Sequence, residues 1–164
     1  MMEKFLIEQR LLQLLRERGL TFAAAESCTG GLIAKRITDL SGASAVFRGG
    51  IVSYTNEVKR DVLGVPQELL DEHGAVSAPV AQAMAEGALR ITGADLAVSV
   101  TGVAGPDRDD RGNEVGTVFF GIASAKTSRA LNVHLQGDRS MIRQLAADHA
   151  FALLLEEMES NLTK

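Results

Sequence analysis

Two nearly continuous apolar runs, at residues 94–100 and 117–123, constrain the fold of this chain more than any other feature. Such a run is typical of a strand buried on both faces, which needs a covering layer on each side of its sheet. Residues 21–25, with small side chains, and residues 47–54 predict two further strands. Residues 130–136 instead alternate between apolar and polar, which predicts a strand that is antiparallel or lies near an edge.

Segments with helical signals alternate with these strands. They predict helices over residues 2–18, 29–39, 56–63, 66–73 and 78–92, and a last one that follows Asp138 as N-cap and runs to about residue 160. The alternation predicts an α/β fold, a three-layer α/β/α sandwich around a mixed, mostly parallel sheet. The chain has 164 residues and no internal repeat or linker, so we expect a single domain over residues 1–164.

Composition argues against several classes of protein. The net charge is −4 and the basic residues are spread along the chain, so we expect no nucleic-acid partner. No apolar run has membrane-spanning length and no segment has the layout of a signal peptide. The one cysteine, Cys28, cannot form an internal disulfide, which favours the cytoplasm. His73, His134 and His149 share no ligand spacing, so we expect no metal site.

Ser27 lies where a predicted strand meets a predicted helix, and Cys28, Thr29, Gly30 and Gly31 follow it. One interpretation is a nucleophilic serine beside backbone N–H groups that bind an oxyanion, with the glycines allowing close backbone approach. The alternative is that Ser27 or Thr29 is only the N-cap of the helix. From this stretch alone, the N-cap is the favoured interpretation.

A nucleophilic serine needs a base, and the three histidines are poorly placed for that role. Lys59 falls in the first turn of a helix that Asn56 is expected to cap, where the helix dipole disfavours a positive charge. A lysine can act as the base if burial or a neighbouring positive field lowers its pKa, and we expect both burial and the helix dipole to act on Lys59. Tyr54 ends the preceding strand and could relay or orient a proton. The alternatives are a solvated lysine and a tyrosine with its hydroxyl in water.

Two further segments carry candidate binding residues. Thr101 and Gly102 directly follow the most apolar strand, and ligands of open α/β sheets bind outside the carboxyl ends of the strands. Arg139 is expected to open the last helix, where a bound phosphate would compensate its unfavourable position in the helix dipole. The alternatives are an ordinary tight loop for the first segment and a salt bridge for Arg139.

Several motifs together resemble the CinA C-terminal domain family, whose enzymes are nicotinamide-nucleotide amidohydrolases. The resemblance runs from about residue 5 to about residue 155, and this chain resembles the family's stand-alone form. The motifs, in order, are Glu26-Ser-Cys-Thr-Gly-Gly31, Gly49-Gly-Ile-Val-Ser-Tyr-Thr-Asn-Glu-Val-Lys59, Leu63-Gly-Val65, His73-Gly-Ala-Val-Ser77, Val100-Thr-Gly-Val-Ala-Gly-Pro106, Val115-Gly-Thr-Val118 and Gly137-Asp-Arg139.

The resemblance implies a role for each matching residue. Ser27 would be the nucleophile, Lys59 the base and Tyr54 a supporting hydroxyl. Three residues match polar or substrate-contacting positions: Ser44, Thr101 and Arg139. One departure is the segment 107–114, which is shorter than in the family and lacks the glycines directly after Asp107 and the proline before Val115; we expect this loop to shape the substrate pocket.

We therefore expect hydrolysis of the carboxamide of nicotinamide mononucleotide to nicotinic acid mononucleotide and ammonia. Backbone N–H groups near Thr29, Gly30 and Gly31 would hold the oxyanion, Gly102 would help to line the site, and neither a metal nor an organic cofactor would be needed. The expected partner is a pyridine mononucleotide, bound by a homodimer. Two alternatives stay open: a non-catalytic nucleotide-binding relative, and a subunit of a larger CinA-like assembly.

Overall fold

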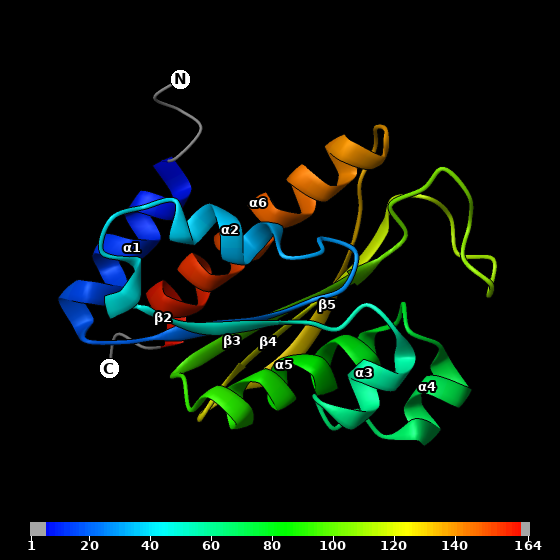
Figure 1. Cartoon of the computed structure of the whole chain (residues 1–164), viewed down its shortest axis with the longest axis horizontal. Helices are drawn as coiled ribbons and strands as arrows, with labels where there is room; N and C mark the ends of the chain where they lie inside the picture. The colour runs from blue at the N-terminus through cyan, green and yellow to red at the C-terminus, as the bar shows by residue number, and fades with distance from the viewer. Residues whose placement is uncertain (1–5, 162–164) are drawn as a thin grey trace.

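The computed structural model describes residues 6–161 and shows one five-stranded sheet between two layers of helices (Figure 1). The strands, in the spatial order β2-β1-β3-β4-β5, are β1 (Phe22–Glu26), β2 (Phe47–Val52), β3 (Leu96–Gly102), β4 (Thr117–Ser124) and β5 (Ser128–His134). One face is covered by α1 (Leu6–Arg18), α2 (Leu32–Thr38) and α6 (Arg139–Asn161). The other is covered by α5 (Ala78–Thr92), with the short helices α3 (Asn56–Asp61) and α4 (Gln67–His73). The predicted α/β/α sandwich is confirmed.

The sheet is mixed, as expected. β1 pairs in parallel with β2 and β3, whereas β3–β4 and β4–β5 are antiparallel. Four strands therefore point in one direction and only β4 opposes them, although parallel and antiparallel pairings are equally numerous. β5 is both antiparallel to its neighbour and at an edge, as its alternating pattern predicts.

The register of the parallel strands positions the functional site. Glu26, the last residue of β1, pairs with Val52 on one side and Val100 on the other. The segments that follow β1, β2 and β3 therefore emerge side by side at one edge of the sheet.

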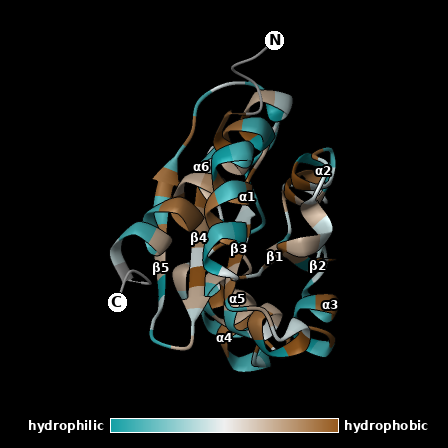
Figure 2. Ribbon diagram, turned by 90° about the vertical axis from the view of Figure 1, so that its left-hand side faces the viewer, coloured by the Kyte–Doolittle hydropathy of each residue, from teal (hydrophilic) through white to brown (hydrophobic). Residues whose placement is uncertain are grey.

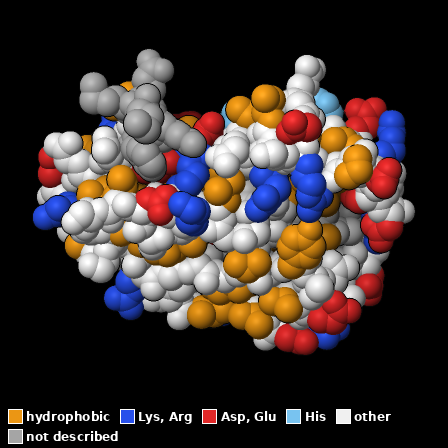
Figure 3. All heavy atoms as spheres, turned by 45° about the horizontal axis from the view of Figure 1, so that its top comes forward, with side chains coloured by type: hydrophobic (Ala, Val, Ile, Leu, Met, Phe, Trp, Pro, Cys, Tyr) orange, Lys and Arg blue, Asp and Glu red, His pale blue; other side chains and the backbone are white. Residues whose placement is uncertain are grey.

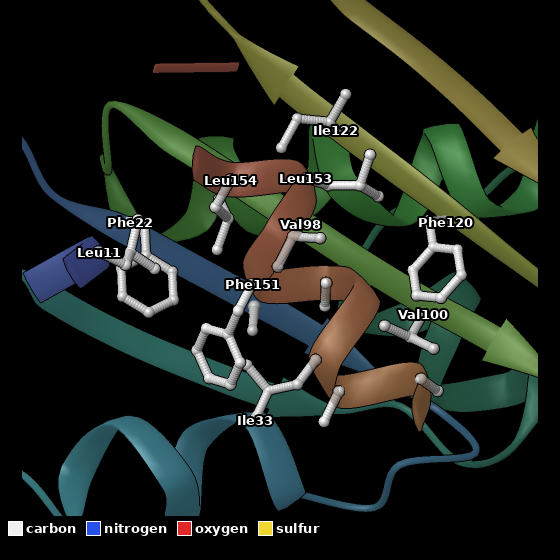
Figure 4. Close-up of a cluster of buried hydrophobic side chains, with 14 of the residues drawn as sticks. Leu11, Phe22, Ile33, Val98, Val100, Phe120, Ile122, Phe151, Leu153 and Leu154 are labelled. Carbon is white, nitrogen blue, oxygen red and sulfur yellow. The ribbon is translucent and has the colours of Figure 1, made fainter. Parts of the chain in front are cut away.

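The larger core lies between the sheet and the layer of α1, α2 and α6. Phe22, Phe120 and Phe151 are fully buried there, and Leu11 and Ile33 pack beside them (Figure 4). Burying a side chain of this size contributes roughly 1.5–3 kcal/mol. Figure 2 shows that α1 presents mostly hydrophilic residues on the side that faces away from this core.

On the opposite face, α5 packs unusually close to the sheet. The Ser99 hydroxyl donates to the carbonyl of Ala81 at 2.5 Å, and the Gly121 N–H donates to the same hydroxyl at 3.0 Å. A Cβ at Gly121 would lie 2.2 Å from the Ala81 carbonyl oxygen, so only glycine fits this contact.

The N-terminal ends of two helices differ from the prediction, α2 in its first residue and α3 in its N-cap. The helix expected from residue 29 begins at Leu32, because Gly30 and Gly31 have φ of 59° and 102°, in the left-handed region. The N-cap of α3 is Thr55 rather than Asn56, since its hydroxyl accepts from the Val58 N–H. The start predicted for the first helix, at residues 2–5, lies outside the described residues.

Between residues 6 and 161, no helix combines the length and apolar character that crossing a bilayer requires. On the face drawn in Figure 3, basic side chains are interspersed with acidic and apolar ones rather than gathered into one stripe.

Candidate active site

A cavity of about 190 Å³ opens at the carboxyl ends of β1, β2 and β3. Its lining includes six of the residues predicted from the sequence: Ser27, Tyr54, Lys59, Thr101, Gly102 and Arg139. They come from segments more than a hundred residues apart in the chain, and the register of the parallel strands together with the start of α6 brings them to one place.

Ser27 and Lys59 form a hydrogen-bonded pair in this cavity. Lys59 Nζ lies 3.0 Å from Ser27 Oγ, and it donates to the Ser53 carbonyl at 2.7 Å. The Lys59 residue is only 1% exposed, and this burial lowers the pKa of its amine to about 8. A nucleophile within hydrogen-bond distance of a base with a lowered pKa is the arrangement that activated serines require.

Burial, rather than a place in the first turn of a helix, accompanies this lowered pKa. Because Thr55 is the N-cap, Lys59 is the fourth residue of a six-residue helix, and its own N–H already bonds the Thr55 carbonyl. The expectation that Lys59 lies in the first turn is therefore wrong by one residue, whereas the expectation that burial lowers its pKa is confirmed.

Cys28 also lines the cavity, but its thiol is a poor nucleophile. Burial raises its pKa to about 12, and the thiolate is the reactive form of cysteine. Of the two adjacent side chains, Ser27 alone has a base within hydrogen-bond distance.

Glu26 is a functional residue that the sequence interpretation missed. Its buried carboxylate accepts from the N–H groups of Ile33 at 2.8 Å and Ala34 at 3.1 Å, so it caps α2. One signal could have revealed it: Gly31 at the N-cap position has no side chain, so the cap must come from elsewhere. The first-turn N–H groups of α2 are thus occupied and do not face a ligand.

The turn after Ser27 differs from the expectation for its N–H groups. Thr29, Gly30 and Gly31 lie beside the cavity rather than in its lining. Gly30 N–H donates to the Ser27 carbonyl at 3.0 Å, and Thr29 is fully buried. Within residues 6–161 no oxygen accepts from the Cys28 N–H, and Cys28 lines the cavity directly after Ser27.

Arg139 and Tyr54 form one side of the cavity mouth. Asp138 caps α6 as predicted, accepting from the Met141 N–H at 2.8 Å, so Arg139 is the first residue of the helix. Its guanidinium donates to the Gly105 carbonyl at 2.6 Å and to the Tyr54 hydroxyl at 3.2 Å. Within residues 6–161 no carboxylate forms an ion pair with Arg139, so its charge is available to an anionic ligand.

Thr101 and Gly102 shape the floor of the cavity. The buried Thr101 hydroxyl donates to the Ala75 carbonyl at 2.8 Å and so ties the end of β3 to the segment before α5. A Cβ at Gly102 would lie 2.8 Å from the Thr117 carbonyl oxygen, which explains the glycine.

The structure does not bring Ser44 to the cavity. Ser44 is exposed in a short 3₁₀ helix, Ala43–Ala45, that precedes β2, whereas the cavity lies beyond the end of β2. A six-residue strand spans roughly 20 Å, which separates this hydroxyl from Ser27 within one chain.

The loop that departs from the family pattern is ordered and attached to α4. Arg111 donates to the carbonyls of Leu70 at 3.3 Å and Glu72 at 3.1 Å, and also to that of Asp71. Asp109 braces the loop by accepting from the N–H groups of Arg111 and Asn113. A second cavity, of about 340 Å³, lies between the loop and α4 and shares Ala75 with the first.

None of the three histidines lines the first cavity; His149 packs against the Phe120 ring instead. Across the part of the chain that the structure describes, no three His, Cys, Asp or Glu side chains are grouped to hold a metal ion.

Fold and site together define an α/β sandwich protein in which a buried lysine is hydrogen-bonded to a half-buried serine at the carboxyl ends of the parallel strands. The chain belongs to the CinA C-terminal domain family, which matches residues 4–158.

Relatives and solved structures agree with this assignment. A CinA-like protein of Geobacter sulfurreducens is 52% identical over 141 residues, which make up 86% of this chain and 34% of that protein. The chain spans about a third of the length of the curated relatives it matches.

The fold is close to crystal structures of the family. The competence damage-inducible protein A (ComA) of Klebsiella pneumoniae has a TM-score of 0.93 at 32% identity, over 96% of this chain and 98% of that one. The competence/damage inducible protein CihA of Agrobacterium tumefaciens has a TM-score of 0.87 at 38% identity, over 93% and 94% of the two chains.

Proposed function

We propose that this protein hydrolyses the carboxamide of nicotinamide mononucleotide, releasing nicotinic acid mononucleotide and ammonia. The observation that carries the proposal is the distance of 3.0 Å between Lys59 Nζ and Ser27 Oγ in the cavity. The motifs shared with a family that contains nicotinamide-nucleotide amidohydrolases supply the substrate.

The geometry supports a two-step reaction. Neutral Lys59 accepts the Ser27 proton as Oγ attacks the amide carbon, and the Ser53 carbonyl keeps the amine in place. The Cys28 N–H stabilises the oxyanion of the tetrahedral intermediate. The C–N bond then breaks, and ammonia leaves with the proton from Lys59. Water attacks the acyl ester, Lys59 takes its proton, and the Ser27 hydroxyl is restored.

The substrate phosphate is assigned to Arg139. Its guanidinium keeps donor groups beyond the two bonds to Gly105 and Tyr54, and no carboxylate in residues 6–161 neutralises it. Tyr54, which is 58% exposed, accepts from Arg139 at 3.2 Å, lines the same cavity as the serine–lysine pair and supports the bound substrate.

Ammonia release from nicotinamide mononucleotide by the purified protein tests the proposal. Ser27→Ala should lower kcat by about two to four orders of magnitude or more while the thermal midpoint stays unchanged, because only a hydroxyl is lost. Ser41→Ala, a matched change at an exposed turn, should keep full activity. Wild-type rates in Ser27→Ala would remove the nucleophile assignment. Binding of the nucleotide without ammonia release would instead indicate a non-catalytic relative.

A further inference from the structure

Arg143 reaches from α6 to the turn that carries the nucleophile. Its Nε donates to the Cys28 carbonyl at 3.1 Å and its Nη2 to the Thr29 carbonyl at 3.0 Å. It lies one helical turn after Arg139, yet it does not line the cavity. No carboxylate in the described chain forms an ion pair with it, so its donors serve these two backbone oxygens.

These bonds connect to the cavity through successive peptide units. In a trans peptide the carbonyl and the following N–H point in opposite directions, so holding one aims the other. Arg143 holds the Thr29 carbonyl, and the N–H of the same peptide unit, from Gly30, donates to the Ser27 carbonyl at 3.0 Å. The Ser27 carbonyl and the Cys28 N–H belong to one peptide unit, and Cys28 lines the cavity. Hydrogen bonds arranged in such a chain polarise and strengthen one another.

The charge of Arg143 acts in the same direction. Burial raises the pKa of the Cys28 thiol, and the positive guanidinium of Arg143 opposes that rise. A negative charge that develops beside Cys28 is therefore stabilised by Arg143 without contact between the two.

We propose that Arg143 is a positioning residue that aims the Cys28 N–H at the oxyanion and keeps the Ser27 hydroxyl in line with Lys59. This inference rests on the proposed function of Ser27 as nucleophile. Because Arg143 does not touch the substrate, its loss should act on the chemical step rather than on binding.

Arg143→Ala should lower kcat for nicotinamide mononucleotide by on the order of a hundredfold, as expected for a lost oxyanion donor, with KM within about threefold. Arg143→Lys keeps the charge and a single-point donor and should recover activity to within about tenfold of wild type. Arg10→Ala removes a guanidinium that ties α1 to α6 far from the turn, and should leave both constants unchanged. A raised KM with unchanged kcat, or wild-type kcat in Arg143→Ala, would overturn the proposal.

A second readout separates this inference from the choice of substrate. A fluorophosphonate labels an activated serine: the Oγ–P bond forms, the P–F bond breaks, fluoride leaves and Lys59 takes the proton. The rate of Ser27 labelling, followed by intact mass, should fall in parallel with kcat. Labelling of a wild type that releases no ammonia would refute the substrate alone, and Arg143 is then judged by the labelling rates of its variants.

If Arg143→Ala does not fold, Arg143→Met, which keeps the aliphatic stem without the guanidinium donors, decides the matter. Slower labelling at an unchanged thermal midpoint supports the proposal, and an unchanged labelling rate refutes it. A wild type that neither labels nor turns over would overturn the Arg143 assignment together with that of Ser27.

Discussion

A lysine amine that is enclosed beside a serine has different acid–base chemistry from one in water. With a pKa of about 8, about one tenth of Lys59 is neutral at pH 7, whereas a lysine of ordinary pKa is almost entirely protonated. Folding therefore supplies a usable base near neutral pH without a histidine.

The pH dependence of the reaction follows from this lowered pKa. The active form is the neutral amine, so kcat/KM should rise with pH and reach a plateau above about pH 8. Lys59→Arg should be about as inactive as Lys59→Ala, because guanidinium stays protonated at any workable pH. Measured pH–rate profiles of the three proteins decide this. Substantial activity in Lys59→Arg would show that Lys59 is a binding cation and not the base.

Arg139 should affect binding of the phosphate rather than bond breaking. Arg139→Ala should raise KM for the mononucleotide by on the order of tenfold or more, since a charge-assisted contact is lost. Activity on the dephosphorylated riboside should change little. Steady-state kinetics with both substrates provide the comparison. Equal losses on the two would indicate that the bonds from Arg139 to Gly105 and Tyr54 support the fold instead.

Among the secondary-structure elements, α5 depends most closely on the absence of a side chain. Gly121→Ala would place a methyl group 2.2 Å from the Ala81 carbonyl and 2.6 Å from the Ser99 hydroxyl, so helix and sheet must separate. The expected loss of unfolding free energy is about 1–3 kcal/mol, measured by urea denaturation. Gly50→Ala in β2 is the matched control: its Cβ finds neighbours at 3.5 Å and should cost far less. Equal stability of the two variants would contradict the close packing.

At the level of helices and strands, sequence patterns predict some features of the structure and not others. Buried strands follow from runs of apolar residues, and because parallel strands end at one edge, the cavity residues at those ends could be predicted together. The starts of α2 and α3 could not be fixed, since they depend on a left-handed Gly31 and on which of two adjacent polar residues caps the helix. The contacts of Glu26 with α2 and of Arg143 with the Ser27 turn depend on tertiary placement, and no local pattern reports them.

At the scale of the whole molecule, the residues of the candidate site come from two distant parts of the chain. Ser27 and Lys59 lie on the segments after β1 and β2, whereas Arg139 and Arg143 come from the helix that ends the described fold. Because the fold brings these distant residues together, the amino-acid composition alone does not indicate a site. The order of several motifs along the chain does indicate a site, because the motifs lie at or near the ends of strands and helices.

The attachment of the 107–114 loop to α4 has an evolutionary consequence. The loop meets the helix through one side chain and three backbone carbonyls, none of which belongs to the serine–lysine pair. No residue of this loop lines the serine–lysine cavity, so insertions, deletions and substitutions there can accumulate without disturbing that pair. A lineage built on this scaffold can thus remodel the second cavity beside α4 while it inherits the first one unchanged.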